Sequence, residues 1–279
     1  MAHTLEQAIA AGADLLASSS ESAKLDAQVL LLHILKKPRS YLFTWPEHAL
    51  SDEQQSQFNV FIQRRLKGEP VAHITGLREF WSLSLEVNAT TLIPRPDTET
   101  LVEQALEIAL PATAKVLDLG TGTGAIALAL GSEMPSWQIT AVDRVSDAVA
   151  LATRNQQRLA INNVHVKQSN WFSELHGEKF NLIVTNPPYI ESSDIHLNQG
   201  DVRFEPLSAL VADDCGMSDI KQIITQSRDY LSSNGYLLIE HGFEQSEAVR
   251  HFFEKMAFVN IKTVKDLGNN DRVTLALWP

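Results

Sequence analysis

Predicted strands and helices alternate from about residue 111 onward, and this order restricts the possible folds more than any other feature. Short apolar runs rich in β-branched residues predict seven strands, near residues 115–119, 138–142, 164–167, 180–185, 236–240, 259–264 and 273–277. Helices are predicted at about 124–133, 146–160, 217–232 and 244–256. Alternating strands and helices form a parallel sheet covered on both faces. We therefore expect a Rossmann-like α/β fold around a seven-stranded, mostly parallel sheet.

The first 70 or so residues have a helical pattern instead. Apolar side chains within residues 25–35 repeat at helical spacing, and Ser51 with Gln54 fits a capping box that begins a second helix. These features predict a small helical bundle, in which Phe43 and Trp45 are expected to be core residues. The basic cluster Arg64, Arg65 and Lys67 is expected to be a solvated helix end.

A change of period separates the bundle from the sheet. Apolar and polar side chains alternate over residues 81–87, which predicts a half-buried strand, and residues 90–93 are expected to pair back with it as a hairpin. The expected organisation is a helical bundle over 1–75, a β-hairpin linker over 76–94 and an α/β domain over 95–279. Residues 190–215 have no clear element and are expected to form a loop that covers a site.

Composition excludes several classes of protein. A formal net charge of −11 argues against broad nucleic-acid binding, which depends on Lys and Arg. The single cysteine, Cys215, excludes an internal disulfide and a multi-cysteine zinc site, and the histidines lack metal-ligand spacing. No apolar run approaches the roughly 18 residues of a membrane span, and the first residues lack a secretory signal. We expect a cytoplasmic protein with no membrane or metal partner.

A glycine-rich turn stands at the end of the first predicted strand of the sheet. The loop residues Gly120, Thr121, Gly122, Thr123 and Gly124 open a helix, where glycines let the backbone approach a ligand and free N–H groups face it. Asp143 follows the next strand and can accept both hydroxyls of a ribose. Together they predict a site for an adenosine-containing cofactor. The simpler alternative is a glycine-rich turn followed by a solvated acid.

The glycine pattern alone leaves two classes of cofactor open. Gly120, Gly122 and Ala125 also satisfy the dinucleotide pattern G-x-G-x-x-G/A, which would suit a dehydrogenase. Asp118 favours the cationic amino-acid end of S-adenosyl-L-methionine, because a carboxylate would repel a pyrophosphate. The loop therefore points toward S-adenosyl-L-methionine without excluding a nicotinamide cofactor.

The tetrapeptide Asn186-Pro187-Pro188-Tyr189 follows the predicted strand 180–185. Two prolines stiffen the turn and leave the Asn186 amide and nearby carbonyls free to face a ligand at the carboxyl end of a strand. Rigid acceptors beside an aromatic ring suit the binding of a flat –NH2 group, which a methyltransferase acting on a planar nitrogen needs and a hydride-transfer enzyme does not. A plain strand-ending turn is the alternative.

The sequence resembles the HemK/PrmC protein-(glutamine-N5) methyltransferases, which modify peptide chain release factors. The resemblance rests on the helical bundle, Glu79-Phe80-Trp81, residues 91–99, the glycine loop, the tetrapeptide and residues 201–206. It implies the class I methyltransferase fold and the cofactor S-adenosyl-L-methionine, with S-adenosyl-L-homocysteine as the product. Positions matching Gly120–Gly124 and Asp143 hold the cofactor in the family, and the position matching Trp171 lies against its adenine. Asn170 is a departure, because relatives usually carry Asp there.

The resemblance also implies roles for the tetrapeptide. Asn186, which contacts both cofactor and substrate, and Pro187 are expected to accept the two N–H groups of a glutamine amide, while Tyr189 packs on its plane beside Pro188. Three alternatives stay open. They are glutamine methylation of a ribosomal protein, methylation of an exocyclic amine in nucleic acid, and a non-catalytic binding module. The acidic charge disfavours the nucleic-acid substrate, and the intact motifs disfavour the binding module.

Overall fold

The computed structural model describes residues 4–279 and divides the chain into two compact units. One unit contains the residues up to Leu77 together with Asn198–Phe204. The other contains Arg78–Leu197 and Glu205–Pro279. The inclusion of Asn198–Phe204 in the first unit was not predicted, because these residues lie far from the N-terminal helices in the sequence.

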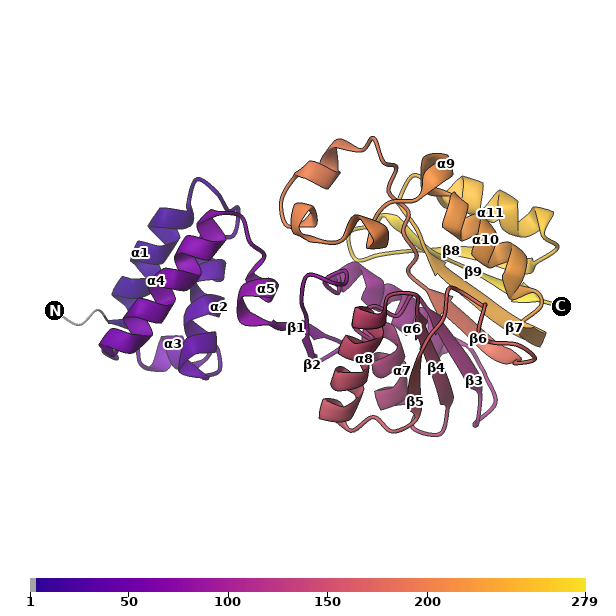
Figure 1. The fold of residues 1–279 in the computed structure, drawn as a ribbon, viewed down its shortest axis with the longest axis horizontal. Helices are drawn as coiled ribbons and strands as arrows, with labels where there is room; N and C mark the ends of the chain where they lie inside the picture. Colours follow the sequence, from indigo (N-terminus) through magenta and orange to yellow (C-terminus); the bar gives the residue numbers. More distant parts are fainter. Residues whose placement is uncertain (1–3) are drawn as a thin grey trace. The chain divides into compact units, whose positions relative to one another are not determined.

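The first unit is the expected helical bundle, drawn in indigo and purple in Figure 1. Its helices are α1 (Leu5–Leu16), α2 (Ala23–Leu35), α3 (Tyr41–Thr44), α4 (Asp52–Leu66) and α5 (Val71–Thr75). The predicted capping box is present: the Ser51 hydroxyl accepts from the Gln54 backbone N–H, and the Gln54 side chain accepts from the Ser51 N–H. Leucines of α1 and α2 pack against Phe58 and Ile62 of α4 to form the core.

The prediction that Phe43 and Trp45 belong to this core is wrong. Their exposed fractions are 72% and 58%. Helix α3 has only four residues and buries Leu42, with Tyr41 partly buried against the same core. Both aromatic rings therefore lie on the surface of the first unit.

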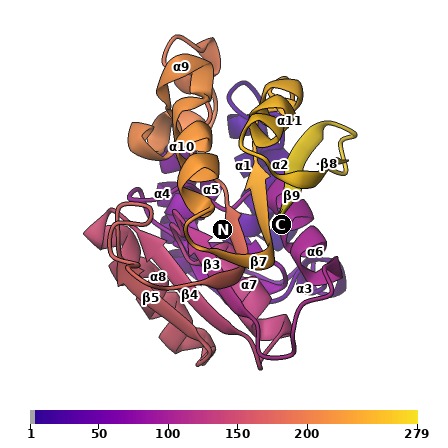
Figure 2. The same ribbon diagram turned by 90° about the vertical axis from the view of Figure 1, so that its right-hand side faces the viewer.

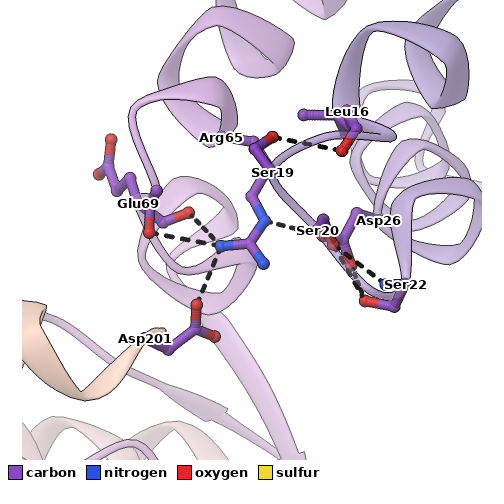
Figure 3. Close-up of polar contacts among 9 residues, drawn as sticks. Leu16, Ser19, Ser20, Ser22, Asp26, Arg65, Glu69 and Asp201 are labelled. Carbon is purple, nitrogen blue, oxygen red and sulfur yellow. Dashed lines mark hydrogen bonds and ion pairs between the residues drawn. The ribbon is translucent and has the colours of Figure 1, made fainter. Parts of the chain in front are cut away.

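Arg65 also differs from the prediction of a solvated helix end. Its side chain is 12% exposed and forms ion pairs with Asp26 of α2 at 2.7 Å and with Asp201 at 2.9 Å (Figure 3). It also donates to the backbone carbonyl of Glu69 at 3.1 Å. Arg65 thus ties residues 198–204 to α2 and to the end of α4 within the first unit, and the local sequence pattern could not show this.

The hairpin exists, but its predicted register is wrong. Its strands are β1 (Leu77–Phe80) and β2 (Leu83–Glu86), and the turn lies at Trp81 and Ser82, whose φ angles are +52° and +59°. A two-residue hairpin turn commonly needs positive φ at both positions. Glu99 stabilises this turn, because its carboxylate accepts from the Trp81 backbone N–H at 2.8 Å. Residues 90–93 form no strand.

The second unit confirms the predicted seven-stranded α/β sheet. Its strands are β3 (Lys115–Leu119), β4 (Gln138–Asp143), β5 (Val164–Gln168), β6 (Phe180–Thr185), β7 (Leu231–Glu240), β8 (Val259–Lys265) and β9 (Asp271–Trp278). They lie in the order β5-β4-β3-β6-β7-β9-β8, and only the pairings made by β9 are antiparallel. The strand order reverses at β3, which has β4 on one side and β6 on the other. Ligand sites of open α/β sheets form at such a point.

Helices cover both faces of this sheet (Figure 2). One face carries α6 (Glu99–Glu107), α7 (Ala125–Glu133) and α8 (Ser146–Leu159), and the other carries α10 (Ser218–Ser227) and α11 (Ser246–Lys255). The side chains of β3 alternate between the two faces. Val116 packs in the hydrophobic cluster under α6 and α7, while Leu117 and Leu119 pack in the cluster under α10 and α11. The loop after β6 contains three short 3₁₀ helices, η2 (Ile195–Asn198), η3 (Val202–Phe204) and η4 (Leu207–Ala209), followed by α9 (Asp213–Gly216).

Candidate functional site

A pocket of about 920 Å³, counting its open mouth, lies at the carboxyl ends of β3, β4 and β6 within the second unit. Its size is in the range of sites for small molecules and cofactors. Eight of the residues predicted for the site are in its wall: Gly120, Thr121, Gly122, Thr123, Asp143, Trp171, Asn186 and Pro188. Asn170 also lines it. The structure therefore brings the glycine loop, the acid after β4 and the tetrapeptide to one cavity.

The glycine loop uses conformations that favour glycine. The φ angles of Gly120, Gly122 and Gly124 are +71°, +54° and +87°. Gly124 is the N-cap of α7 and does not line the pocket. A Cβ atom on Gly120 would lie 3.3 Å from the Trp171 ring, so this glycine also lets the indole pack directly on the loop.

Asp118 has a different place from the one its sequence position suggested. Its side chain is fully buried, does not line the pocket, and accepts hydrogen bonds from the Thr121 hydroxyl at 2.6 Å and from the Ala127 N–H at 3.2 Å. Burial raises the pKa of this carboxyl to about 7. Asp118 thus stabilises the glycine turn through hydrogen bonds inside the core, and its carboxyl does not face a cationic ligand in the pocket.

Asp143 links the glycine loop to β4. One carboxylate oxygen accepts from the Gly122 N–H at 2.9 Å, and the other accepts from the Val145 N–H at 2.9 Å. The side chain is half-buried and lines the pocket, and each carboxylate oxygen can accept a further bond. The acid can therefore hold the loop and still accept hydroxyl groups of a ligand.

Trp171 forms another part of the pocket wall, with its ring against Gly120. Its residue is 9% exposed, its φ is +50°, and the Ser169 hydroxyl donates to its backbone carbonyl at 2.8 Å. The neighbouring Asn170 is exposed at the pocket rim. A flat apolar surface here suits an aromatic ligand group.

The tetrapeptide reaches the pocket only in part. Asn186 and Pro188 line it, whereas Pro187 and Tyr189 do not. The Asn186 Nδ2 atom donates to the Thr98 hydroxyl at 3.2 Å. Tyr189 donates its hydroxyl proton to Glu240 Oε1 at 3.3 Å, and burial raises its pKa.

The sequence analysis missed three side chains around the tetrapeptide. Thr98 ends the 3₁₀ helix η1 (Pro96–Thr98) before α6, Glu240 ends β7, and Glu205 follows η3. Glu205 is buried and accepts from the Ile93 N–H at 3.1 Å and from Arg95 at 2.7 Å. A signal existed for Glu240, because polar residues at the carboxyl ends of parallel strands often belong to sites, and Thr98 and Glu205 lie within the segments 91–99 and 201–206 that carry the family resemblance.

The loop after β6 contributes to the pocket through one segment. Ser208 and Ala209 of η4 line it, and the Ser208 carbonyl accepts from Arg144 at 3.0 Å. A bridge between Ile190 and Val211 closes the loop at its base. The expected site-covering role thus applies to residues near η4, whereas residues 198–204 pack in the first unit.

Within residues 4–279, no group of three His, Cys, Asp or Glu side chains gathers as a metal site. The same residues include no helix with the length and hydropathy to cross a membrane. Buried His241 forms hydrogen bonds with the Thr274 hydroxyl and the Gly242 carbonyl, which is a structural arrangement.

Comparison with known proteins identifies the family. Residues 7–76 match the family described as PrmC N-terminal domain, and residues 96–203 match the methyltransferase small domain. A release factor glutamine methyltransferase of Shewanella oneidensis is 60% identical over 94% of this chain and 92% of its own length. That of Escherichia coli is 56% identical over 93% of this chain and 94% of its own length.

A solved structure supports the fold independently. A methyltransferase from Pyrococcus furiosus aligns with a TM-score of 0.53 and 16% identity, over 77% of this chain and 96% of its own. The fold is therefore that of a methyltransferase. At more than half identical residues over nearly the whole length of its relatives, the chain belongs to the family of release factor glutamine methyltransferases.

Proposed function

We propose that this protein transfers a methyl group from S-adenosyl-L-methionine to the side-chain amide nitrogen of a glutamine in a peptide chain release factor. The names of its relatives support this substrate and reaction. The observation that carries the proposal is the position of Asn186, whose carboxamide lies in the wall of the pocket that also contains the glycine loop and Asp143. A group that can hold an amide and a site for an adenosine cofactor thus share one cavity.

The residues present fit S-adenosyl-L-methionine. The Trp171 ring offers a flat apolar surface in the pocket wall, and Asp143 presents a half-buried carboxylate to the pocket for ribose hydroxyls. Residues Gly120–Gly124 lead into the N-terminus of α7. We infer that these residues hold the cofactor, which supplies an electrophilic methyl group on a sulfonium sulfur.

The protein's task toward the substrate is positioning. An amide nitrogen is a poor nucleophile, because its lone pair is shared with the carbonyl. We infer that the Asn186 side-chain oxygen and the Pro187 carbonyl accept the two amide N–H groups and fix the nitrogen. Correct placement of reacting groups contributes up to roughly 7–11 kcal/mol. Acceptors directed at positive charge developing on nitrogen add to this.

Tyr189 and Pro188 are proposed to complete the amide site. The Tyr189 hydroxyl is held by Glu240, and its backbone carbonyl accepts from the Gln245 side chain at 3.0 Å. These two contacts fix the residue at both ends, so that its ring can restrict the direction of a bound amide. Pro188 contributes an apolar surface in the pocket wall.

We propose that the N-terminal unit, residues 1–75 in the sequence-based division, recognises the protein substrate. The exposed rings of Phe43 and Trp45 support this role, because exposed aromatic residues are typical of protein interfaces. Since release factors work with ribosomes, we infer that the enzyme acts in the cytoplasm.

The decisive experiment combines Asn186→Ala with a choice of substrates. Labelled S-adenosyl-L-methionine is incubated with a release factor, with ribosomal proteins or with DNA, and the labelled product is identified. We expect label on a release factor glutamine, a turnover at least about a hundredfold lower in Asn186→Ala, and cofactor binding that survives the substitution. Asn162→Ala, at an exposed turn, is the matched control. Label on DNA alone, or full activity of Asn186→Ala, would refute the proposal.

A further inference from the structure

Glu240 is a buried carboxyl beside the tetrapeptide. The residue is 1% exposed, and its Oε2 atom has no close hydrogen-bond partner among residues 4–279. Tyr189 donates to Oε1, and the Thr98 hydroxyl also faces the carboxyl and lowers its pKa by hydrogen bonding. A buried carboxylate that lacks a full set of donors is costly, so its retention needs a reason.

The sheet places Glu240 level with Asn186. In the parallel pairing of β6 with β7, Thr185 lies opposite Ile239, so the next residues along the two strands are Asn186 and Glu240. Thr98, at the start of α6, contacts both of them. Its hydroxyl therefore stands between the carboxyl of one strand end and the carboxamide of the next.

The Thr98 hydroxyl determines which end of the Asn186 carboxamide, its amino group or its oxygen, faces Thr98. A hydroxyl has one proton to donate, and a carboxylate can only accept. When Thr98 donates its proton to Glu240, its oxygen is left to accept from the Asn186 amino group, as observed at 3.2 Å. The other end of the carboxamide, the Oδ1 atom, is then directed away from Thr98.

We propose that Glu240 and Thr98 are positioning residues for methyl transfer, which set the Asn186 carboxamide so that its oxygen is the acceptor presented to the substrate amide. The inference rests on the proposed function, since it concerns the orientation of the group that holds the glutamine. We call the two hydrogen bonds, from Thr98 to Glu240 and from Asn186 to Thr98, the relay. Without the relay, the Asn186 amino group can turn toward the substrate, and its two N–H groups then face the two N–H groups of the substrate amide.

The relay reverses when Glu240 takes up a proton. A protonated carboxyl can donate to Thr98, and Thr98 can then donate to the Asn186 oxygen, which favours the wrong amide direction. Burial raises the pKa of Glu240 to about 7. The charged and titratable groups that face it are Tyr189 after β6, Arg272 of β9 and Asp97 of η1. The productive direction therefore requires ionised Glu240, and kcat should rise with pH through about 7.

The first test compares Thr98→Val with Thr98→Ser, using purified release factor and labelled cofactor. Valine keeps the shape of threonine and removes the hydroxyl, whereas serine keeps the hydroxyl. We expect Thr98→Val to lower kcat by at least about tenfold, because one oriented hydrogen bond is lost, and Thr98→Ser to restore most of it. The cofactor affinity of both variants should match the wild type. Equal kcat in Thr98→Val and wild type would overturn the proposal.

The second test concerns pH. The kcat of Glu240→Gln should lose the rise through about pH 7, because a glutamine amide does not titrate. Glu244→Gln, the same change at an exposed position after β7, should keep it. A rise in Glu240→Gln equal to that of wild type would overturn the relay.

Failure of the relay and failure of the proposed function give different results. If Asn186→Ala abolishes turnover while Thr98→Val and Glu240→Gln behave as wild type, the positioning inference alone is wrong. If Asn186→Ala is fully active, the proposed amide site itself is wrong.

Discussion

The Asp143 carboxylate at the end of β4 accepts a hydrogen bond from the Gly122 N–H, in the loop after β3, at 2.9 Å. The acid that sequence analysis assigned to a ribose therefore also holds the glycine loop in shape. Through this contact the two halves of the proposed cofactor site are physically coupled.

Asp143→Ala should consequently weaken cofactor binding in two ways. It removes the proposed hydroxyl acceptor and leaves the Gly122 and Val145 N–H groups without their partner. Because hydrogen bonds to charged groups contribute about 1.5–3 kcal/mol, we expect the dissociation constant for S-adenosyl-L-methionine to rise at least about tenfold. Titration calorimetry measures it. Asp147→Ala, on the exposed side of α8, is the matched control, and an unchanged dissociation constant in Asp143→Ala would contradict the assignment.

The contact between Gly120 and Trp171 leads to a second prediction. An alanine at position 120 would have an unfavourable φ of +71° and a Cβ atom 3.3 Å from the indole. At Gly177, φ is +75° and a Cβ atom would meet no neighbour within 4 Å. Both alanine variants should lose about 1–2 kcal/mol of stability from the left-handed conformation, as measured by urea unfolding. Only Gly120→Ala should also lose cofactor affinity, because the indole must move. Equal affinity in the two variants would show that the indole does not limit binding.

Arg65 provides a prediction for the first unit. Removing its charge in Arg65→Met leaves Asp26, whose side chain is 8% exposed, with hydrogen bonds from the Ser20 and Ser22 hydroxyls but without its charged partner. Breaking a nearly buried pair should cost about 2–4 kcal/mol of stability. Asp201→Asn should cost at most about 1 kcal/mol, because Asp201 is 39% exposed.

Hydrogen–deuterium exchange separates the two roles of Arg65. Exchange across residues 198–204 should quicken in Arg65→Met and in Asp201→Asn, since both remove the ion pair that holds this segment. Asp26→Asn keeps that pair and should change exchange there least. Unchanged exchange of the segment in Arg65→Met would mean that the ion pair does not anchor it.

Local patterns were sufficient to predict the sheet and half of the site. The strands β3, β4 and β6 are short, largely buried and mostly apolar, and the glycine loop, Asp143 and the tetrapeptide each stand at the carboxyl end of one of them. Because parallel strands end at one edge, their order in the sequence already placed these residues together.

The missed features depend on partners that are distant in the sequence. The predicted pairing of residues 81–87 with 90–93 puts the turn at residues 88–89, but the turn lies at Trp81 and Ser82, where Glu99 accepts from the Trp81 N–H. The Arg65–Asp201 ion pair joins positions 136 residues apart, and the Asn186–Thr98 bond joins positions 88 residues apart. Periodicity and motif spacing report on neighbours along the chain, so they could not reveal these pairs.

The buried carboxyls predict how stability depends on pH. Burial raises the pKa of Asp118 from 3.8, and that of Glu240 from 4.5, to about 7 in the folded state. Between about pH 4.5 and 7 these two carboxyls therefore bind more protons in the folded protein than in the unfolded chain, so their contribution to the free energy of unfolding falls as the pH rises. His241 and His33 act in the opposite sense up to about pH 6.5, because burial lowers their pKa in the folded state. Asp271, whose pKa is lowered by hydrogen bonds from Ser246 and Lys265, also opposes them, but only near and below pH 4.

Urea unfolding of the cofactor-free protein between pH 5 and 8 measures this dependence. We expect a loss on the order of 3 kcal/mol per buried carboxyl across the full window. Glu240→Gln should flatten the curve by its share, whereas Glu244→Gln, which changes an exposed side chain, should leave the slope unchanged. A free energy of unfolding that depends on pH equally in Glu240→Gln and in wild type between pH 5 and 8 would mean that Glu240 is already ionised in the folded protein. In that case the pH-dependent rise of kcat expected from the Glu240 relay could not occur near pH 7 either, so the stability curve tests the electrostatic basis of the relay without any substrate.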